Sequence, residues 1–297
     1  MKTIKYLLLC TFVFCTISAF AADNSKRGWQ LDLKRLALNL TSTNVKNANK
    51  YQGFSDTRLT ADDQTTIQGA LDFRADYFGQ SYLWSNGVLA EYGKSSIEKS
   101  DGEKLTTETV DRIIFDTSYT LRLWNVQDFL GGFEAGPYLL GAYETEFSTS
   151  GNAPLKKLVR GELGAKLFEG KYLKALYIAG LGEGDFTYQD NVTKFGWTAG
   201  FNVEVPVREG VKAMFKGIWR NYLHNSKDLP SDLDYSLELD ARMEVLVWKN
   251  LSVAPFITFF TAQGKHIAPR GQNLFIGVSF SFSKLFLEAQ DVNAETK

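Results

Sequence analysis

The side chains that could act as acids, bases or nucleophiles are few. The chain has two His, His224 and His266, and both lie in segments expected to be loops. His224-Asn225-Ser226 brings a base near a hydroxyl, but residues so close in sequence rarely reach the geometry of a nucleophile and its base. The chain has no Gly-x-Ser-x-Gly elbow, no His-Glu-x-x-His pair and no phosphate-binding loop. We therefore expect no enzymatic activity, and a lipid-acting enzyme is the least favoured alternative.

Metal binding has equally little support in the sequence. Two His cannot complete a zinc site without help from carboxylates. Asp62-Asp63, and Asp228 with Asp232 and Asp234, could supply oxygen ligands for calcium, although solvated loops account for these residues better. We expect no metal, no cofactor and no catalytic residue.

The other chemically capable side chains are charged residues that alternate with apolar ones. Charges enclosed in a protein must be paired or solvated, so they would either cross-link a narrow interior or line a water-filled passage. Basic residues in 212–220 and acidic ones in 234–244 would neutralise one another on neighbouring strands, which favours pairing over a solute site there. The candidate lumen-lining residues are Asp72, Arg74, Arg112, Asp116, Arg160, Glu162, Lys212, Lys216, Arg220, Glu238, Asp240 and Arg242.

The alternation that carries these charges has a period of two, which is the signature of β-strands. The clearest cases are 195–207, 233–247 and 274–282, where apolar side chains take every second position. In 31–40 the apolar residues change parity, and a bulge near Lys34-Arg35 would reconcile the two halves. Weaker alternation fills the rest, and we expect about 12 strands, within a range of about 10–14.

The connections between these strands alternate in length. Long ones are expected at 42–63, 94–107, 146–154, 183–193, 222–232 and 263–271, and short ones at 78–80, 124–128, 169–171, 208–210 and 248–250. Short turns at one end and long loops at the other are typical of outer-membrane β-barrels. The sequence therefore predicts an all-β fold, a single transmembrane antiparallel up-and-down barrel with both termini on the short-turn side.

Alternation alone does not separate a membrane barrel from a soluble sandwich, but two features favour the barrel. Strands of about 10–14 residues exceed the roughly 5–6 residues usual in soluble sheets. Aromatic residues also gather at the expected strand ends, as the interfacial girdles of a barrel would require. The first set is Trp29, Tyr77, Phe78, Tyr82, Trp124, Tyr172 and Trp248, and the second is Tyr92, Tyr143, Phe147, Phe186, Tyr188, Trp219 and Tyr222.

The N-terminal segment has the features of a signal peptide. Lys2 and Lys5 precede an apolar run, and Ala19-Phe20-Ala21 has the small-x-small pattern of a cleavage site. We expect residues 1–21 to be removed, 22–283 to form the barrel and 284–297 to be a periplasmic tail. Both Cys of the chain, Cys10 and Cys15, lie in the segment expected to be removed, so no disulfide is expected.

Two short motifs resemble known outer-membrane barrels. Gly277-Val278-Ser279-Phe280-Ser281-Phe282 resembles the assembly signal that such barrels carry on their final strand, which implies recognition by the barrel-assembly machinery. Leu83-Trp84-Ser85-Asn86, Glu91-Tyr92-Gly93, and then Lys99, Asp101 and Lys104 resemble a Gram-negative outer-membrane barrel family of unknown function. The Asn-Trp-x-x-Gly-Gly-type opening of that family is not found near 47–53, and the family supplies no catalytic residue.

These observations predict a porin-like protein of the outer membrane of a Gram-negative bacterium. A passive or weakly selective channel for small solutes is the leading expectation. The alternative is a structural or surface-binding barrel that acts through the loops 42–63 and 94–107. The expected partners are outer-membrane lipid and small solutes. A net charge of −1 excludes the basic excess expected of a nucleic-acid binder.

Overall fold

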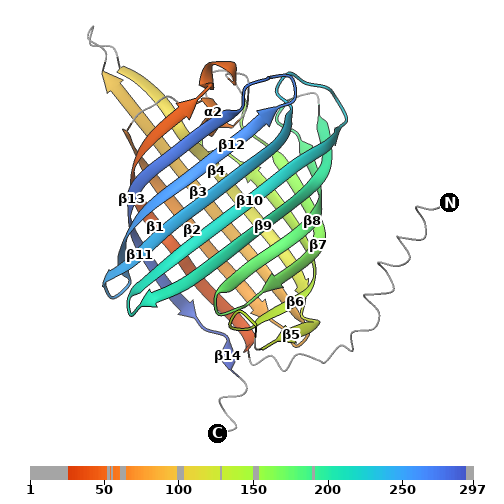
Figure 1. Ribbon diagram of the computed structural model, residues 1–297, viewed down its shortest axis with the longest axis vertical. Coiled ribbons are helices and arrows are strands. Elements are labelled where there is room, and N and C mark those ends of the chain that lie inside the picture. Colours follow the sequence, from red (N-terminus) through yellow and green to blue (C-terminus); the bar gives the residue numbers. More distant parts are fainter. Residues whose placement is uncertain are drawn as a thin grey trace, which may run out of the picture.

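The structure is a computed structural model that describes residues 26–51, 54, 56–60, 65–98, 104–127, 129–149, 154–188 and 191–291. Its main strands form one antiparallel ring in which each strand pairs with its neighbours along the chain, and β13 closes the ring by pairing with β1 (Figure 1). The ring strands are β1 (Lys26–Lys46), β2 (Thr65–Phe78), β3 (Tyr82–Glu98), β4 (Lys104–Leu121), β6 (Phe133–Thr145), β7 (Leu158–Phe168), β8 (Leu173–Asp185), β9 (Val192–Arg208), β10 (Val211–Asn225), β11 (Leu233–Trp248), β12 (Leu251–Gly264) and β13 (Gly271–Leu287).

Within the described ranges, the ring therefore contains twelve strands, and the predicted fold class, a closed up-and-down barrel, is confirmed. Two short strands lie outside the ring: β5 (Trp124–Val126) pairs with β6, and β14 (Gln290–Asp291) pairs with the first residues of β1. No helix in the described part of the chain is long and apolar enough to cross a membrane.

Apolar side chains at alternate positions of the strands point away from the barrel axis. Leu36, Leu38 and Leu40 of β1 are about half exposed, whereas Asn39 and Thr41 between them are buried. The same division holds on β13, where Ile276 and Phe280 are exposed and Ser279 is buried. The barrel thus has an apolar outer surface and a polar interior, the reverse of a soluble sandwich.

The predicted bulge in β1 is present. The register of β1 against β2 shifts between Leu33 and Arg35, and its register against β13 shifts between Leu33 and Leu36. The extra residue moves the apolar positions to the other parity, which keeps Leu36 and Leu38 on the outer face.

Several predicted boundaries differ from the structure. The loop expected at 42–63 begins at 47, because β1 continues to Lys46 in register with β13. The loop expected at 94–107 is largely a hairpin, since β3 reaches Glu98 and β4 starts at Lys104. The turn expected at 124–128 is a longer connection that contains β5 and in which Leu130, Gly131 and Gly132 have positive φ.

The C-terminal residues expected to form a tail from 284 onward also take part in the fold. β13 runs to Leu287, whose partner is Leu31 of β1, and Ala289 packs with Phe78 and Phe168. Figure 1 shows β14 and β5 at one end of the barrel and α2 (Thr57–Thr60) at the other. We refer to these as the short-turn end and the long-loop end.

Aromatic side chains occupy both ends, with two exceptions to the predicted girdles. At the short-turn end, Trp29 contacts Tyr77 and Trp84 on the outer face. Phe78 is 1% exposed and lies inside the barrel, because it shares the inward parity of β2. Tyr222 also points inward, where its hydroxyl donates to Glu183 at 3.3 Å.

Candidate functional site

The segment after β1 folds into the long-loop end of the barrel. It contains η1 (Ala48–Lys50) and α2, and α2 contacts β4 as well as β12 and β13. β4 is separated from β13 by three ring strands, so α2 extends across part of the opening. We call the described residues of this segment, 47–51, 54 and 56–60, the mouth segment.

An apolar cluster holds the mouth segment against the barrel wall. Tyr51 and Leu59 are fully buried and pack against Phe260 and Ala262 of β12. The hydroxyl of Tyr51 donates to Pro269 O at 2.8 Å and accepts a hydrogen bond from the N–H of Gly264 at 3.1 Å. These contacts fix the segment on one side of the opening.

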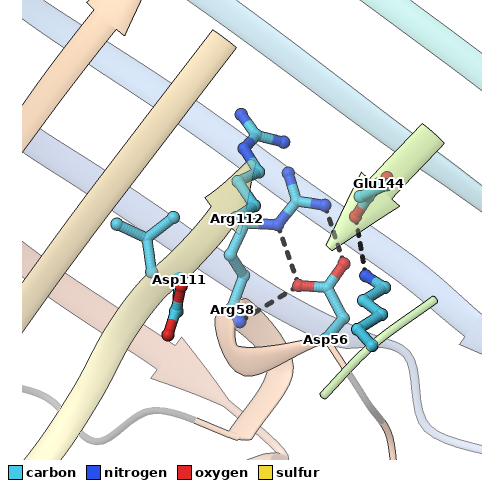
Figure 2. Close-up of a pocket in the computed structure, with 7 residues that line it drawn as sticks. Asp56, Arg58, Asp111, Arg112 and Glu144 are labelled. Carbon is cyan, nitrogen blue, oxygen red and sulfur yellow. Dashed lines mark hydrogen bonds and ion pairs between the residues drawn. The ribbon is translucent and has the colours of Figure 1, made fainter. Parts of the chain in front are cut away.

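Arg58 adds polar contacts to this attachment, and Figure 2 shows its side chain beside Asp56. Its guanidinium bonds Asp56 of the same segment at 2.7 Å and Glu238 of β11 at 2.5 Å. It also lies over the ring of Phe260, with 3.8 Å between Cζ and the ring centroid. Each contact uses the planar, delocalised charge of an arginine.

Ion pairs continue from Arg58 across the barrel. Glu238 also accepts a hydrogen bond from Arg112 of β4 at 3.3 Å, and Arg112 pairs with Glu91 of β3 at 2.7 Å. Arg35 of β1 bonds the same Glu91 at 3.2 Å. Since β4 and β11 lie on opposite sides of the ring, this chain of charges spans the interior.

A second set of ion pairs follows the wall near the mouth segment. Lys156, in the connection between β6 and β7, bonds Glu144 at 2.7 Å, and Arg160 links Glu144 at 3.1 Å to Glu183 at 2.9 Å. Asp56, Arg58, Arg112, Glu144 and Lys156 enclose a cavity of about 10 Å³, room for about one water molecule.

The charged groups of the loops keep their charges in this environment. Burial would raise the pKa of Asp56, but the Arg58 guanidinium outweighs burial and holds that pKa below its usual value. Burial would lower the pKa of Lys156, and the Glu144 carboxylate reverses this and raises it. The pKa of Arg58 is also raised, because the attraction of Asp56 and Glu238 exceeds the cost of burial. The attachment of the mouth segment is therefore ionic at neutral pH.

The short-turn end is narrowed by different means. Phe78 and Phe168 point inward and pack with Leu83 and Ala289. Beside them, Arg122 forms a two-fold ion pair with Glu134, with both distances 2.6 Å. Next to this pair lies a cavity of about 320 Å³ lined by residues of β1, β5 and the connection between β5 and β6.

Most of the candidate lumen residues lie in polar contacts inside the barrel. Arg74 bonds Asp116 at 2.7 Å and lies 3.9 Å from Asp72. Glu162 accepts from the hydroxyl of Tyr138 at 2.9 Å. Arg112, Arg160 and Glu238 belong to the ion pairs described above. Lys212, Asp240 and Arg242 contact, respectively, Glu244 at 3.6 Å, Thr258 at 2.7 Å and Ser279 at 3.4 Å.

Lys216 and Arg220 differ from the others, since neither side chain forms an ion pair or a hydrogen bond within the described residues. The pairing expected between 212–220 and 234–244 is therefore present only for Lys212 and Glu244. The register places Lys216 opposite Asp240, but the Asp240 carboxylate accepts from Thr258 of β12 instead.

The structure gives no geometry for the catalytic and metal alternatives. His224 and Ser226 make no hydrogen bond to each other, and Ser226 Oγ instead accepts from the N–H of Thr193. Asp228 pairs with Lys265 at 2.7 Å and His266 at 2.9 Å, and no group of three His, Cys, Asp or Glu among the described residues could hold a metal ion. Asp62 and Asp63 lie outside the described residues.

Sequence reasoning did not identify Tyr51, Asp56 and Arg58. The mouth segment was expected to be part of the loop 42–63, and its three described large apolar residues, Tyr51, Phe54 and Leu59, were the signal that it packs against the barrel. Apolar residues gain stability by packing, and here Tyr51 and Leu59 pack against Phe260 and Ala262 of β12.

Comparison with known proteins does not identify a family for this chain. No family model and no curated protein matches the chain, so the resemblance to a family of unknown function stays a hypothesis. Solved structures similar to the chain include a NanC porin (10% identity, TM-score 0.41, covering 82% of this chain and 98% of that one). Another is outer membrane phospholipase A from Escherichia coli, with 9% identity and a TM-score of 0.39, covering 83% of this chain and 89% of that one. A third is the translocator domain of autotransporter NalP from Neisseria meningitidis, with 8% identity and a TM-score of 0.36, covering 95% of this chain and 98% of that one. At these identities and TM-scores, none of them indicates a function for this chain.

Proposed function

We propose that this protein is an outer-membrane channel for small solutes and that the mouth segment restricts its opening. The observation that carries the proposal is a charged interior inside an apolar outer surface. A water-soluble barrel would have no reason to expose Leu36, Leu163 and Ile178 while it encloses ion pairs. Solvent reaches part of this interior, because the side chains of Arg74 and Lys212 are 34% and 37% exposed.

The mouth segment favours a channel over a surface-binding barrel. A binding loop would present its side chains to the outside, whereas Tyr51, Leu59 and Arg58 turn toward the barrel wall and interior. Contacts of this kind control the cross-section of a passage. The β13 motif around Phe280 supports assembly in the outer membrane through the barrel-assembly machinery.

Planar-bilayer recordings test the proposal. The purified protein should give discrete current steps whose size rises with salt concentration, because ions would cross a water-filled interior. We expect small steps from the wild type, since ion pairs and the mouth segment occupy its interior. If neither the wild type nor a variant with a released mouth segment conducts over a range of voltages and salts, the channel proposal is wrong.

Tyr51→Phe tests whether the mouth segment is held as described. The substitution removes one hydroxyl that satisfies Pro269 O and the Gly264 N–H, and a buried group left without its partner costs about 1–3 kcal/mol. The Gly264 amide should therefore exchange its hydrogen faster in Tyr51→Phe. Tyr188→Phe is the matched control, because Tyr188 is an exposed loop tyrosine at the same end. Equal exchange in both variants would contradict the docking of Tyr51.

A further inference from the structure

The basic side chains inside the barrel differ in how closely a carboxylate holds them. Arg58, Arg74, Arg112, Arg122, Lys156 and Arg160 each have a carboxylate oxygen within 3.0 Å or less. Lys216, Arg220 and Arg242 have no ion pair among the residues that the structure describes. Another inward amine without an ion pair, Lys166 of β7, instead lies over the rings of Tyr138 and Phe168.

The three unpaired cations lie together on one wall. Lys216 and Arg220 share the inward parity of β10 and are four residues apart, about 13 Å along an extended strand. Arg242 of β11 is the register partner of Met214, two residues from Lys216 toward the short-turn end. The cations therefore occupy three different levels along the barrel, and we call them the basic track.

The donors of the basic track are poorly satisfied by the protein. Arg220 Nε is buried and has no hydrogen-bond partner within the described residues. Lys216 makes no hydrogen bond there either, and the one that Arg242 makes is to the Ser279 hydroxyl at 3.4 Å. Among the described residues, none of these three neighbouring cations has a carboxylate within ion-pair distance, which distinguishes them from Arg58, Arg112 and Arg160 of the same interior.

The carboxylates near the basic track contact groups other than the three track cations. Asp240 lies opposite Lys216, but its carboxylate accepts from Thr258. Glu238, at a level between Lys216 and Arg220, binds Arg58 and Arg112. Among the described residues, no carboxylate thus forms an ion pair with any of the three track cations.

We propose that Lys216, Arg220 and Arg242 form a binding track for small anions with carboxylate or phosphate oxygens. Unpaired guanidinium and ammonium donors are the groups that recognise such oxygens, and a row of them lets an anion move between sites. The inference deepens the proposed channel function and rests on it, because it assigns anions as the preferred solutes of that channel.

Reversal potentials in a KCl gradient test the track. The wild type, and an Arg58→Ala variant with a released mouth segment, should pass chloride in preference to potassium. Lys216→Gln, Arg220→Gln and Arg242→Gln should each lower the chloride-to-potassium permeability ratio about threefold, as expected for one unit charge acting over several ångströms through water. Inorganic phosphate should reduce the chloride current of the wild type, and the triple variant should lose this block.

The matched control is the double variant Arg74→Gln/Asp116→Asn. It removes one paired cation of the same interior together with its carboxylate, so the net charge is unchanged and the permeability ratio should stay at the wild-type value. Circular dichroism of each variant verifies that the barrel has formed.

The outcomes separate the track from the channel. A current that prefers potassium, or a permeability ratio that none of the three Gln substitutions alters, overturns the track and leaves the channel standing. If no variant conducts, the channel proposal fails, and calorimetric titration of the detergent-solubilised protein with inorganic phosphate then decides the anion site. Binding that is lost in the triple variant supports the site, and the absence of binding to the wild type overturns it.

Discussion

Arg58→Ala should increase the conductance of the barrel. The substitution removes the guanidinium that bonds Asp56 and Glu238 and covers Phe260. Removing one partner of a buried ion pair costs about 3–5 kcal/mol, because a buried charge is left uncompensated. A loss of about 3 kcal/mol shifts the equilibrium between docked and released mouth segment by roughly 100-fold. Single-channel recordings should show larger steps and a greater fraction of time in the open state.

Lys50→Ala is the control for this experiment. Lys50 belongs to the same segment, is exposed, and carries the same charge, so its removal changes the net charge equally without breaking an interior contact. Conductance of Lys50→Ala should match that of the wild type. If Arg58→Ala gives the same steps as Lys50→Ala, the mouth segment does not restrict the passage.

A double-mutant cycle tests whether Glu238 is the partner through which Arg58 acts. Glu238→Gln should also open the barrel, since it removes the charge that Arg58 and Arg112 share. The double variant should then open little more than either single variant, because residues in one ion-pair network do not contribute independently. Fully additive effects would place the action of Arg58 at Asp56 or Phe260.

The fold was predictable from the sequence because barrel strands follow a local rule. Every second residue must meet an apolar environment, so the alternation in 195–207 and 233–247 defines strands without knowledge of their partners. Even the bulge of β1 could be located, because Leu33 and Leu36 lie on different parities. The same rule indicates which side chains point inward, as the cross-barrel contact of Arg112 with Glu238 shows.

The partners of the inward residues were not predictable in the same way. Arg58 and Glu238 are 180 positions apart, and only the closed ring brings them together. Local reasoning paired Lys216 with an acidic residue on the next strand. In the structure, the Asp240 carboxylate accepts a hydrogen bond from Thr258 of β12 instead. The prediction that Phe78 belongs to the outer girdle was wrong for a related reason. An aromatic residue at a strand end can lie in an outer girdle or in an inner cluster, and its parity on the strand decides which.

These differences share a physical origin. The outer face of each strand meets one uniform environment, so any apolar residue of suitable size satisfies it. The inner face meets specific neighbours from up to twelve strands, and each charge there needs a partner at a defined distance. The outer surface can thus be inferred from residue type, while the interior depends on geometry that the closed ring creates.

Leu163→Arg should prevent stable insertion of the barrel, because it places a charge on the outer surface at the middle of β7. Leu163 is 68% exposed and lies midway between the ends of Leu158–Phe168. An arginine at the midplane of a membrane barrel costs about 2–4 kcal/mol, and the cost falls to about 0–1 kcal/mol near the interfaces. Urea titration of the barrel folded into lipid vesicles should therefore show a large loss of stability for Leu163→Arg.

Leu223→Arg supplies the matched comparison for this prediction. Leu223 is 73% exposed, but it lies two residues from the end of β10 at the long-loop end, where a charged side chain can reach water. We expect Leu223→Arg to fold with nearly wild-type stability in the same vesicles. Equal and small losses in both variants would mean that the exposed leucines do not face lipid. The apolar outer surface would then need another explanation, such as a protein partner that covers it, and the channel proposal would lose its main physical argument.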